Sequence, residues 1–267
     1  MGMSDTPASP GPAWRALVAA DPARPFVTAY DTSGGRVELS RATVDNWVSK
    51  TSNMLIDGLG AQPGDRVAVA LPLHWQSLVW LLAAWSVGAI AEPARPGEVP
   101  SGAHFAVADA DRLETALDSG AEEVVGTSLH PLGMPLSGTP PMVTDYTVEV
   151  RGHGDHFAHY PVDAGEPALR SDREYTGAEL VEAGRARAET WDLGEKDRIA
   201  VLSGEHAPLS VLGANLSVLG AAVHAGTPLV LTPGSADGLA QRLSTEHVTA
   251  AVSADGTAVP EGVRALD

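Results

Sequence analysis

The chain of 267 residues has no cysteine. Disulfides, thiolate nucleophiles and cysteine-bound zinc are therefore excluded. Lysine is scarce as well, because Lys50 and Lys196 are the two lysines of the sequence. Acidic residues outnumber basic ones by 34 to 17, which gives a formal net charge of −17. Such a surface argues against nucleic acids and anionic membranes as partners, since both bind basic patches.

Long hydrophobic runs are also missing. The longest apolar stretch, residues 78–90, is shorter than a bilayer crossing and includes Ser86 and Gly88. Residues 1–12 are polar and rich in proline, without the apolar centre of a signal peptide. We therefore expect a disordered lead over residues 1–12 and a cytoplasmic protein that meets neither nucleic acid nor membrane. A homodimer is the default expectation, because symmetric dimers are the commonest oligomers.

Phosphate-binding motifs are missing too. The sequence contains no G-x-x-x-x-G-K-[ST], and no G-x-G-x-x-G follows a strand-like run. Neither lysine follows a glycine-rich loop. A nucleoside triphosphate would therefore lack the usual cradle of backbone N–H groups and a lysine.

What the chain does contain is an internal repeat. The pentapeptide DRVAV at residues 65–69 returns as DRIAV at residues 197–201, an offset of 197 − 65 = 132. Gly88 returns as Gly220 at the same offset. Each copy runs from an apolar strand through a short polar turn into a helix-length apolar stretch. Two copies are too few for a solenoid, so the repeat predicts two similar α/β lobes.

The order of strand-like and helix-like runs indicates a mostly parallel sheet covered by helices on both faces. We place the two lobes at about residues 37–100 and 170–233. An irregular segment at 128–167, rich in proline, glycine and histidine, joins them. The pattern predicts one helix over 207–222 in the second lobe and a single strand over 146–150 in the irregular segment.

Both copies carry motifs that resemble the adenylate-forming enzymes, a group that includes acyl-CoA synthetases, luciferases and peptide-synthetase adenylation domains. Residues 64–72 (GDRVAVALP) and 88–93 (GAIAEP) resemble the opening of that family's N-terminal domain. Residues 202–206 (LSGEH) fall where the family carries a strand ending in a substrate-pocket histidine. More narrowly, the runs 128–133 and 145–155 resemble a short actinobacterial family of unassigned activity.

The resemblance implies an α/β fold of two similar, mostly parallel sheets with helices packed between and around them. This is the fold of the N-terminal domain of acyl-CoA synthetase-like enzymes, and residues 13–267 would form one such domain without a C-terminal domain. The family's phosphate loop, rich in serine, threonine and glycine, stands just before the second copy. Here the matching interval, residues 163–174, carries acidic residues and is not glycine-rich. The family's later motifs and its catalytic lysine are also missing.

With these losses, the resemblance predicts a non-catalytic, truncated relative of adenylate-forming enzymes that binds a small molecule or a protein partner. We predict no catalytic residue and no cofactor, apart from residual binding of AMP or acyl-CoA. Two alternatives remain open. One is an enzyme of altered chemistry with a His/Asp site at residues 153–159. The other is an AMP- or acyl-binding subunit that another protein completes.

Three residues are predicted to form a pocket wall. Glu205 and His206 end the strand of the second copy, and ligands of open α/β sheets bind at the carboxyl ends of strands. His74 holds the same position after the strand of the first copy. A helix cap would also explain His206, and buried packing would explain His74.

A second cluster has the spacing of metal ligands. It consists of His153, Asp155 and His156, followed by His159. Histidine and aspartate side chains bind zinc and related metals. However, Arg151 stands where a metallo-hydrolase motif would place its first histidine. We favour a solvated loop without metal for this segment.

Overall fold

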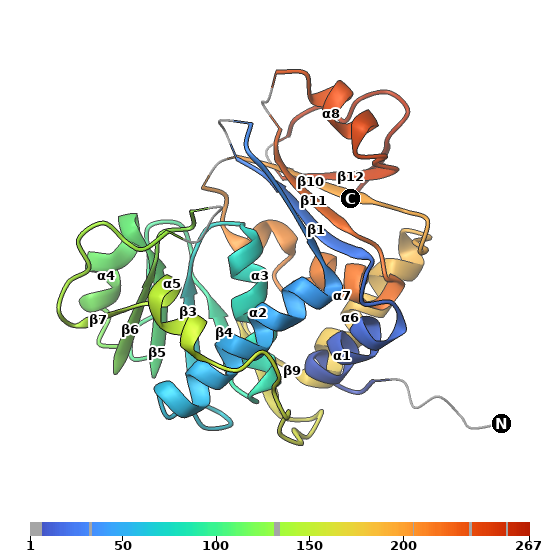
Figure 1. Cartoon of the computed structure of the whole chain (residues 1–267). Coiled ribbons are helices and arrows are strands. Elements are labelled where there is room, and N and C mark those ends of the chain that lie inside the picture. Colours follow the sequence, from blue (N-terminus) through green and yellow to red (C-terminus); the bar gives the residue numbers. More distant parts are fainter. Residues whose placement is uncertain (1–6, 32–33, 131–133, 205, 235–236, 255) are drawn as a thin grey trace.

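The computed structural model describes residues 7–31, 34–130, 134–204, 206–234, 237–254 and 256–267. They form an α/β fold of two mostly parallel sheets with helices between and around them (Figure 1), which confirms the predicted fold class. The helices are α1 (Pro10–Ala20), α2 (Arg41–Asn53), α3 (Trp75–Ser86), α4 (Leu113–Leu117), α5 (Tyr146–Glu149), α6 (Gly177–Thr190), α7 (Ser217–Ala225) and α8 (Leu239–Thr245).

The first sheet has six strands in the order β13-β12-β10-β11-β1-β2. Every neighbouring pair in it is parallel except β1 and β2, which form an antiparallel hairpin. Its strands are β1 (Pro25–Tyr30), β2 (Arg36–Ser40), β10 (Ile199–Ser203), β11 (Leu229–Pro233), β12 (Ala250–Ser253) and β13 (Arg264–Leu266).

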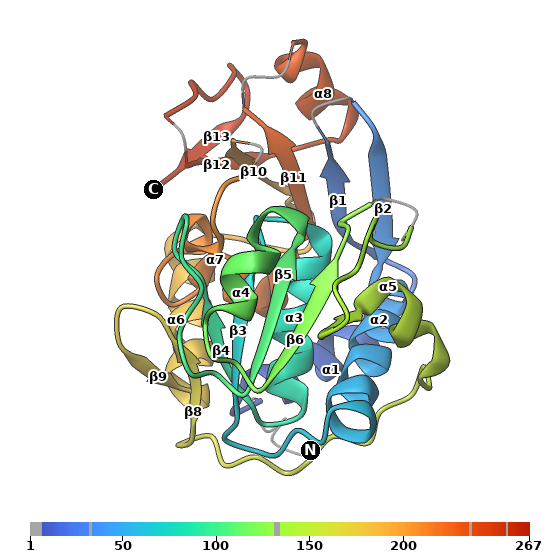
Figure 2. The same cartoon turned by 90° about the vertical axis from the view of Figure 1, so that its left-hand side faces the viewer.

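The second sheet has seven strands in the order β7-β6-β5-β3-β4-β8-β9. It is also parallel except for one hairpin, β8 and β9. Figure 2 shows this sheet facing the viewer, with α4 in front of it and α3 behind it. Its strands are β3 (Arg66–Ala70), β4 (Ile90–Pro93), β5 (Phe105–Asp109), β6 (Glu123–Thr127), β7 (Val143–Asp145), β8 (Pro167–Arg170) and β9 (Glu174–Thr176).

Helix α3 is the centre of the core. All twelve of its residues are buried, and Leu78, Trp80 and Leu81 are fully inaccessible to solvent. A helix that is apolar on every side is stable only when other elements surround it. Accordingly, α3 packs against α1 and α2 and contacts strands of both sheets, namely β3, β4 and β1.

The two copies of the repeat exchange their hairpins. The β1–β2 hairpin leads the first copy, yet β1 pairs with β11 of the second copy in the register Val27↔Leu229. The β8–β9 hairpin leads the second copy, yet β8 pairs with β4 of the first copy at Ala91↔Leu169. Each sheet is therefore completed by a hairpin from the other half of the sequence.

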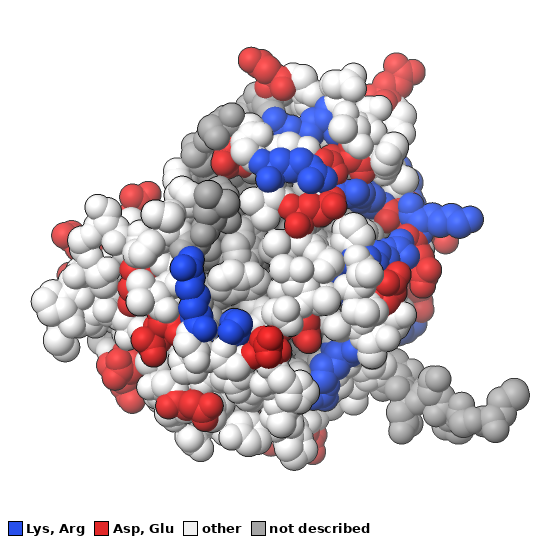
Figure 3. Space-filling view, viewed as in Figure 1, with Lys and Arg blue, Asp and Glu red and all other residues white. Residues whose placement is uncertain are grey.

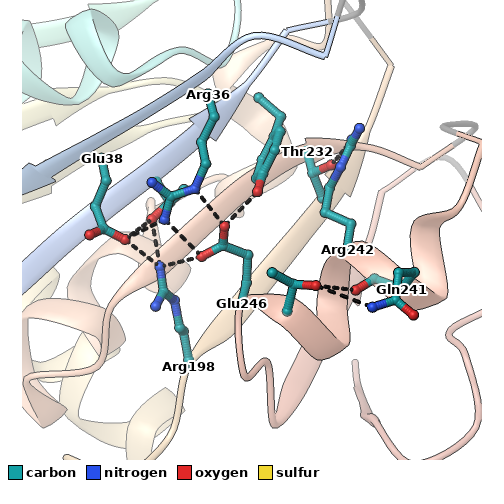
Figure 4. A network of polar contacts seen from close by, with 10 residues as sticks. Arg36, Glu38, Arg198, Thr232, Gln241, Arg242 and Glu246 are labelled. Atoms are coloured by element: carbon teal, nitrogen blue, oxygen red, sulfur yellow. Dashed lines mark hydrogen bonds and ion pairs between the residues drawn. The ribbon is translucent and has the colours of Figure 1, made fainter.

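An ion-pair network around the buried carboxylate of Glu246 joins the β1–β2 hairpin to later parts of the chain (Figure 4). Glu246 follows α8 and is only 3 % exposed. Its carboxylate accepts hydrogen bonds from Tyr30 at 2.5 Å and Arg36 at 2.7 Å, and it pairs with Arg198 at 2.8 Å. Arg198 also pairs with Glu38 of β2 at 3.0 Å. The network thus links β1 and β2 to the residue that precedes β10.

Helices α6 and α7 cross in direct backbone contact at two glycines. A Cβ atom built on Gly184 would lie 2.5 Å from the carbonyl carbon of Gly220. A Cβ atom built on Gly220 would in turn lie 2.9 Å from Cα of Gly184. No side chain larger than hydrogen fits between the two helices at this point.

The structure corrects the alignment of the repeat. Gly88 follows α3 with φ +78°, and the glycine that follows α7 in the same way is Gly226, with φ +67°. The counterpart of Gly88 is therefore Gly226, at an offset of 226 − 88 = 138. Gly220, the predicted counterpart, lies inside α7 at the crossing with α6. Extra residues before α7 in the second copy account for the difference.

Three local predictions were wrong in part. The helix expected over 207–222 is broken into a 3₁₀ turn, Leu209–Leu212, and α7, because Gly213 and Leu216 have positive φ. The strand expected over 146–150 is instead α5 followed by a 3₁₀ turn, while β7 directly precedes it. Helix α1 begins at Pro10, so residues 10–12 are helical rather than part of a lead. Residues 1–6 lie outside the described residues.

Candidate functional site

A cavity of about 360 Å³ lies between the two sheets at the carboxyl ends of their strands. Residues that follow β3, β5, β6 and β10 line it, together with the last residues of β11 and the tip of the β1–β2 hairpin. In parallel α/β sheets this is the edge where ligands bind. The hairpin exchange matters here, because it brings β1 and β2 to a cavity built largely by later strands.

A short backbone bridge joins the two copies at this cavity. Pro72 and Pro208 pair as an isolated antiparallel bridge, and the N–H of Leu73 donates to the carbonyl oxygen of Ala207 at 2.7 Å. His74 follows Pro72 by two residues, and His206 precedes Pro208 by two. Both histidines line the cavity. The two histidines predicted from corresponding positions of the repeat therefore share one site.

His74 is a neutral hydrogen-bond donor. Its Nδ1 accepts a hydrogen bond from the N–H of Gln76 at 3.3 Å and so caps the start of α3. The proton of the neutral ring is then on Nε2. Burial lowers the pKa of His74 to about 4, so the ring is uncharged at neutral pH. The ring therefore brings no positive charge to the cavity wall at neutral pH.

Asp109 is the buried acid of the site. It ends β5, is 7 % exposed, and accepts the N–H of Arg112 at 3.1 Å while pairing with the Arg112 guanidinium at 3.2 Å. Burial raises the pKa of Asp109, whereas Arg112 and, more weakly, His206 lower it. Asp111 follows on the cavity wall and is exposed. Sequence reasoning missed both aspartates, although they follow a buried strand as His74 does.

No lysine or arginine side chain of the described residues lies on the wall of the cavity. All 17 lysines and arginines of the chain lie within the described residues, and none of them lines the cavity. Asp31, Asp109 and Asp111 do line it. Arg112 does not line the cavity. Its guanidinium pairs with Asp109 and donates to the carbonyl oxygen of Ala70 at 3.1 Å. On the face shown in Figure 3, most basic side chains likewise have an acidic neighbour.

The structure describes the three candidate metal ligands, His153, Asp155 and His156. His153 lies 3.7 Å from Glu149, whereas Asp155 and His156 are exposed. Helix α2 holds this segment through its backbone, because Asn53 donates to the carbonyl oxygens of Gly154 and His156 at 2.8 and 3.0 Å. In the described part of the chain, no three histidine, aspartate or glutamate side chains are arranged to hold a metal ion.

Glu205, the third predicted wall residue, lies outside the described residues.

A larger apolar cavity of about 430 Å³ runs between α1 and α7, away from the strand ends. Its buried arginine, Arg41, donates to the carbonyl oxygens of Leu17, Asp21 and Gly226, so it joins the ends of the two helices. We therefore assign the candidate site to the cavity between the sheets. Among the described helices, none has the length and apolarity needed to cross a membrane.

The chain is similar in sequence to known proteins. The model of the AMP-binding enzyme family matches residues 14–114. A protein of Mycobacterium tuberculosis named "TIGR03089 family protein" is 36 % identical over 243 residues, which covers 87 % of this chain and 93 % of the relative.

Solved structures share the fold at low identity. An acyl-CoA synthetase of Brucella canis superposes with a TM-score of 0.75 at 17 % identity, over 94 % of this chain and 48 % of the other. MatB of Rhodopseudomonas palustris gives 0.68 at 16 % identity, over 91 % and 49 %. Coronafacic acid ligase of Pectobacterium brasiliense gives 0.72 at 13 % identity, over 92 % and 50 %. The chain thus spans about half the length of these structures.

Proposed function

From the premise that this chain belongs to the TIGR03089 family and is related to adenylate-forming enzymes, we propose that it binds a small organic molecule and does not form adenylates by itself. The proposed binding site is the cavity between the sheets, lined by His74 and His206. Its volume falls in the range of about 300–1,000 Å³ that is usual for small-molecule sites.

The observation that carries the proposal is the lack of any lysine or arginine on the cavity wall. Adenylate formation needs positive groups or oriented N–H groups on the phosphates of ATP, because charge develops there in the transition state. Aspartates on the wall oppose a polyphosphate instead.

The interval that the resemblance assigns to the phosphate loop supports the same conclusion. Residues 171–173 form a tight turn between β8 and β9, in which the N–H of Ser171 donates to the carbonyl oxygen of Arg173 at 3.0 Å. Asp172 in this turn accepts hydrogen bonds from the hydroxyls of Ser171 and Tyr175. A three-residue turn centred on a carboxylate offers no cradle for phosphates.

The first test is ATP–pyrophosphate exchange with a panel of carboxylic acids. We expect no exchange above the protein-free background. Exchange with any acid, lost in the His206→Ala variant, would show that the chain forms adenylates and would overturn the proposal.

A thermal-shift titration tests the binding part directly. ATP, AMP and acyl-CoA, each with and without Mg²⁺, are compared with uncharged and cationic small molecules, because a ligand of the native state raises the melting temperature. We expect the uncharged or cationic set to give the larger shifts. Shifts from AMP or acyl-CoA that vanish in His74→Ala would instead support residual binding of these compounds.

A second function is favoured by one observation, namely that the chain spans about half of the solved structures it matches. In this function another protein supplies a counterpart of the part of those structures that the chain does not match, together with its cations. The test is co-purification of a partner with the tagged full chain from its own cells. A complex of the chain and its partner that catalyses ATP–pyrophosphate exchange would support this function. A complex that catalyses no exchange would contradict it.

A further inference from the structure

The charges around the cavity do not balance. Asp109 is compensated by Arg112 at 3.2 Å. Asp111 is exposed on the wall two residues later and has no ion-pair or hydrogen-bond partner within the described residues. Asp31, at the tip of the β1–β2 hairpin, is a third carboxylate on the wall, and it accepts the N–H of Gly35 at 2.7 Å.

His74 does not offset this excess at neutral pH in the way a lysine would. His74 is held neutral by its surroundings and offers its Nε2–H as a donor. His206 is exposed at the mouth of the cavity and interacts electrostatically with Asp109. The carboxylates of the wall therefore make the electrostatic potential in the cavity negative, on a chain whose formal net charge is −17.

The remainder of the wall is mixed, with the polar side chains of Tyr30, Ser128, Ser203 and Thr232 beside a set of apolar ones. Leu73, Trp75, Leu129 and Leu231 line the cavity together with Val37. Trp75 adds to this wall an aromatic side chain that is 3 % exposed, and aromatic rings attract organic cations as well as apolar groups. A ligand that fits this wall has an apolar or aromatic body and a polar head that faces the aspartates.

We infer that the ligand of the cavity is an amine, with an apolar or aromatic body and a nitrogen that is positively charged at neutral pH. This inference rests on the proposed function. It goes further by assigning the charge of the ligand, which is opposite to that of a nucleotide or a carboxylic acid. The ammonium group lies beside Asp111, and the apolar body packs against Leu73, Trp75 and Leu129 in the part of the cavity that the structure describes.

The test compares three probes that share a phenylethyl body and differ in charge, namely 2-phenylethylamine, 2-phenylethanol and 3-phenylpropionate. Dissociation constants are measured on the full chain by NMR titration of backbone amides. We expect the amine to bind about tenfold more tightly than the acid, with the alcohol between them, and the preference for the amine to shrink at high salt. Shifted amides should include those of residues 73–75 and 109–111.

A matched pair of variants shows where the charge preference comes from. Asp111→Asn should weaken the amine about threefold and leave the alcohol unchanged, as is typical of an exposed charge pair. Asp57→Asn, which removes an exposed carboxylate away from the cavity, should change neither. If Asp57→Asn weakens the amine as much as Asp111→Asn does, net charge alone explains the preference and the inference is wrong.

The outcomes separate the inference from the proposed function. Tightest binding of the acid, with shifts at the same amides, would overturn the amine assignment and leave ligand binding in the cavity standing. Shifts confined to surfaces remote from residues 73–75 and 109–111, or no binding of any probe, would also overturn it. In that case the nucleotide titration and the exchange assay decide on the proposed function independently.

Discussion

The N–H of Leu73 donates to the carbonyl oxygen of Ala207 at 2.7 Å, and this hydrogen bond joins the two copies of the repeat at the cavity. The two residues follow corresponding strands, β3 and β10. The cavity is therefore a shared property of both copies, because each contributes the loop after its first strand and the histidine on that loop. Neither copy alone would form it.

The first prediction concerns the pH dependence of stability. The pKa of His74 is lowered by burial from 6.5 to about 4, so the unfolded chain binds a proton that the folded chain excludes. Stability should therefore fall as pH decreases from about 6.5 towards 4. His74→Asn keeps a side chain that can cap α3 but does not titrate, and it should flatten this part of the curve. Urea unfolding at several pH values measures the effect.

His159 contributes in the same direction, because burial lowers its pKa to about 4 as well. His74→Asn should thus remove part of the slope and not all of it. The matched variant His159→Asn should remove the other part of the slope. An unchanged slope in His74→Asn would show that His74 is not held neutral.

The second prediction concerns the crossing of α6 and α7. A methyl group at Gly184 would lie 2.5 Å from the backbone of Gly220, and neither helix can move without disturbing the core. Gly184→Ala should therefore lower the free energy of unfolding by about 2 kcal/mol, although alanine favours helices. Gly152→Ala is the control, because nothing lies within 4 Å of a Cβ atom there. Equal stability of the two variants would contradict the close approach of the helices.

The third prediction concerns Glu246. Burial alone would raise the pKa of Glu246, but hydrogen bonds from Arg36 and Tyr30 and the charge of Arg198 lower it below its ordinary value. Glu246→Gln leaves Arg36 and Arg198 without their buried partner and should cost about 2–4 kcal/mol of stability. Chemical denaturation measures it. The exposed Glu182 of α6 is the control, and Glu182→Gln should have little effect.

The lowered pKa of Glu246 also predicts how its contribution to stability depends on pH. Its stabilising contribution is complete above its ordinary pKa of 4.5 and is lost as pH falls through the lowered value. The difference in stability between the parent chain and Glu246→Gln should therefore shrink in acid. A difference that stays constant from pH 7 to pH 3 would rule out the ion-pair network as its origin.

Part of the site could be predicted from the sequence. Strands β3 and β10 are continuous apolar runs, and the rule that ligands bind after parallel strands identified His74 and His206. The same rule applied to β5 would have identified Asp109 and Asp111. The contribution of Asp31 could not have been found in this way, because it depends on the pairing of β1 with β11, which no local pattern encodes.

The failed helix over 207–222 has a physical cause that is not local either. The apolar spacing suits a helix, but Gly213 and Leu216 adopt positive φ, and α7 begins only at Ser217. Glycine usually weakens a helix. Gly220 is needed in α7 because a Cβ atom there would collide with Gly184 of α6. Tertiary packing therefore decided both where α7 begins and which glycine matches Gly88.

The exchanged hairpins also determine when the protein can fold during its synthesis. The β1–β2 hairpin leaves the ribosome early, but β11, the strand that β1 pairs with, begins only at Leu229. Until then β1 has an open edge, and α3 lacks the sheet that covers its other side. A nascent chain that stalls before β11 would expose both surfaces and become a client of chaperones, whereas a chain that includes β11 can pair β1 and cover α3.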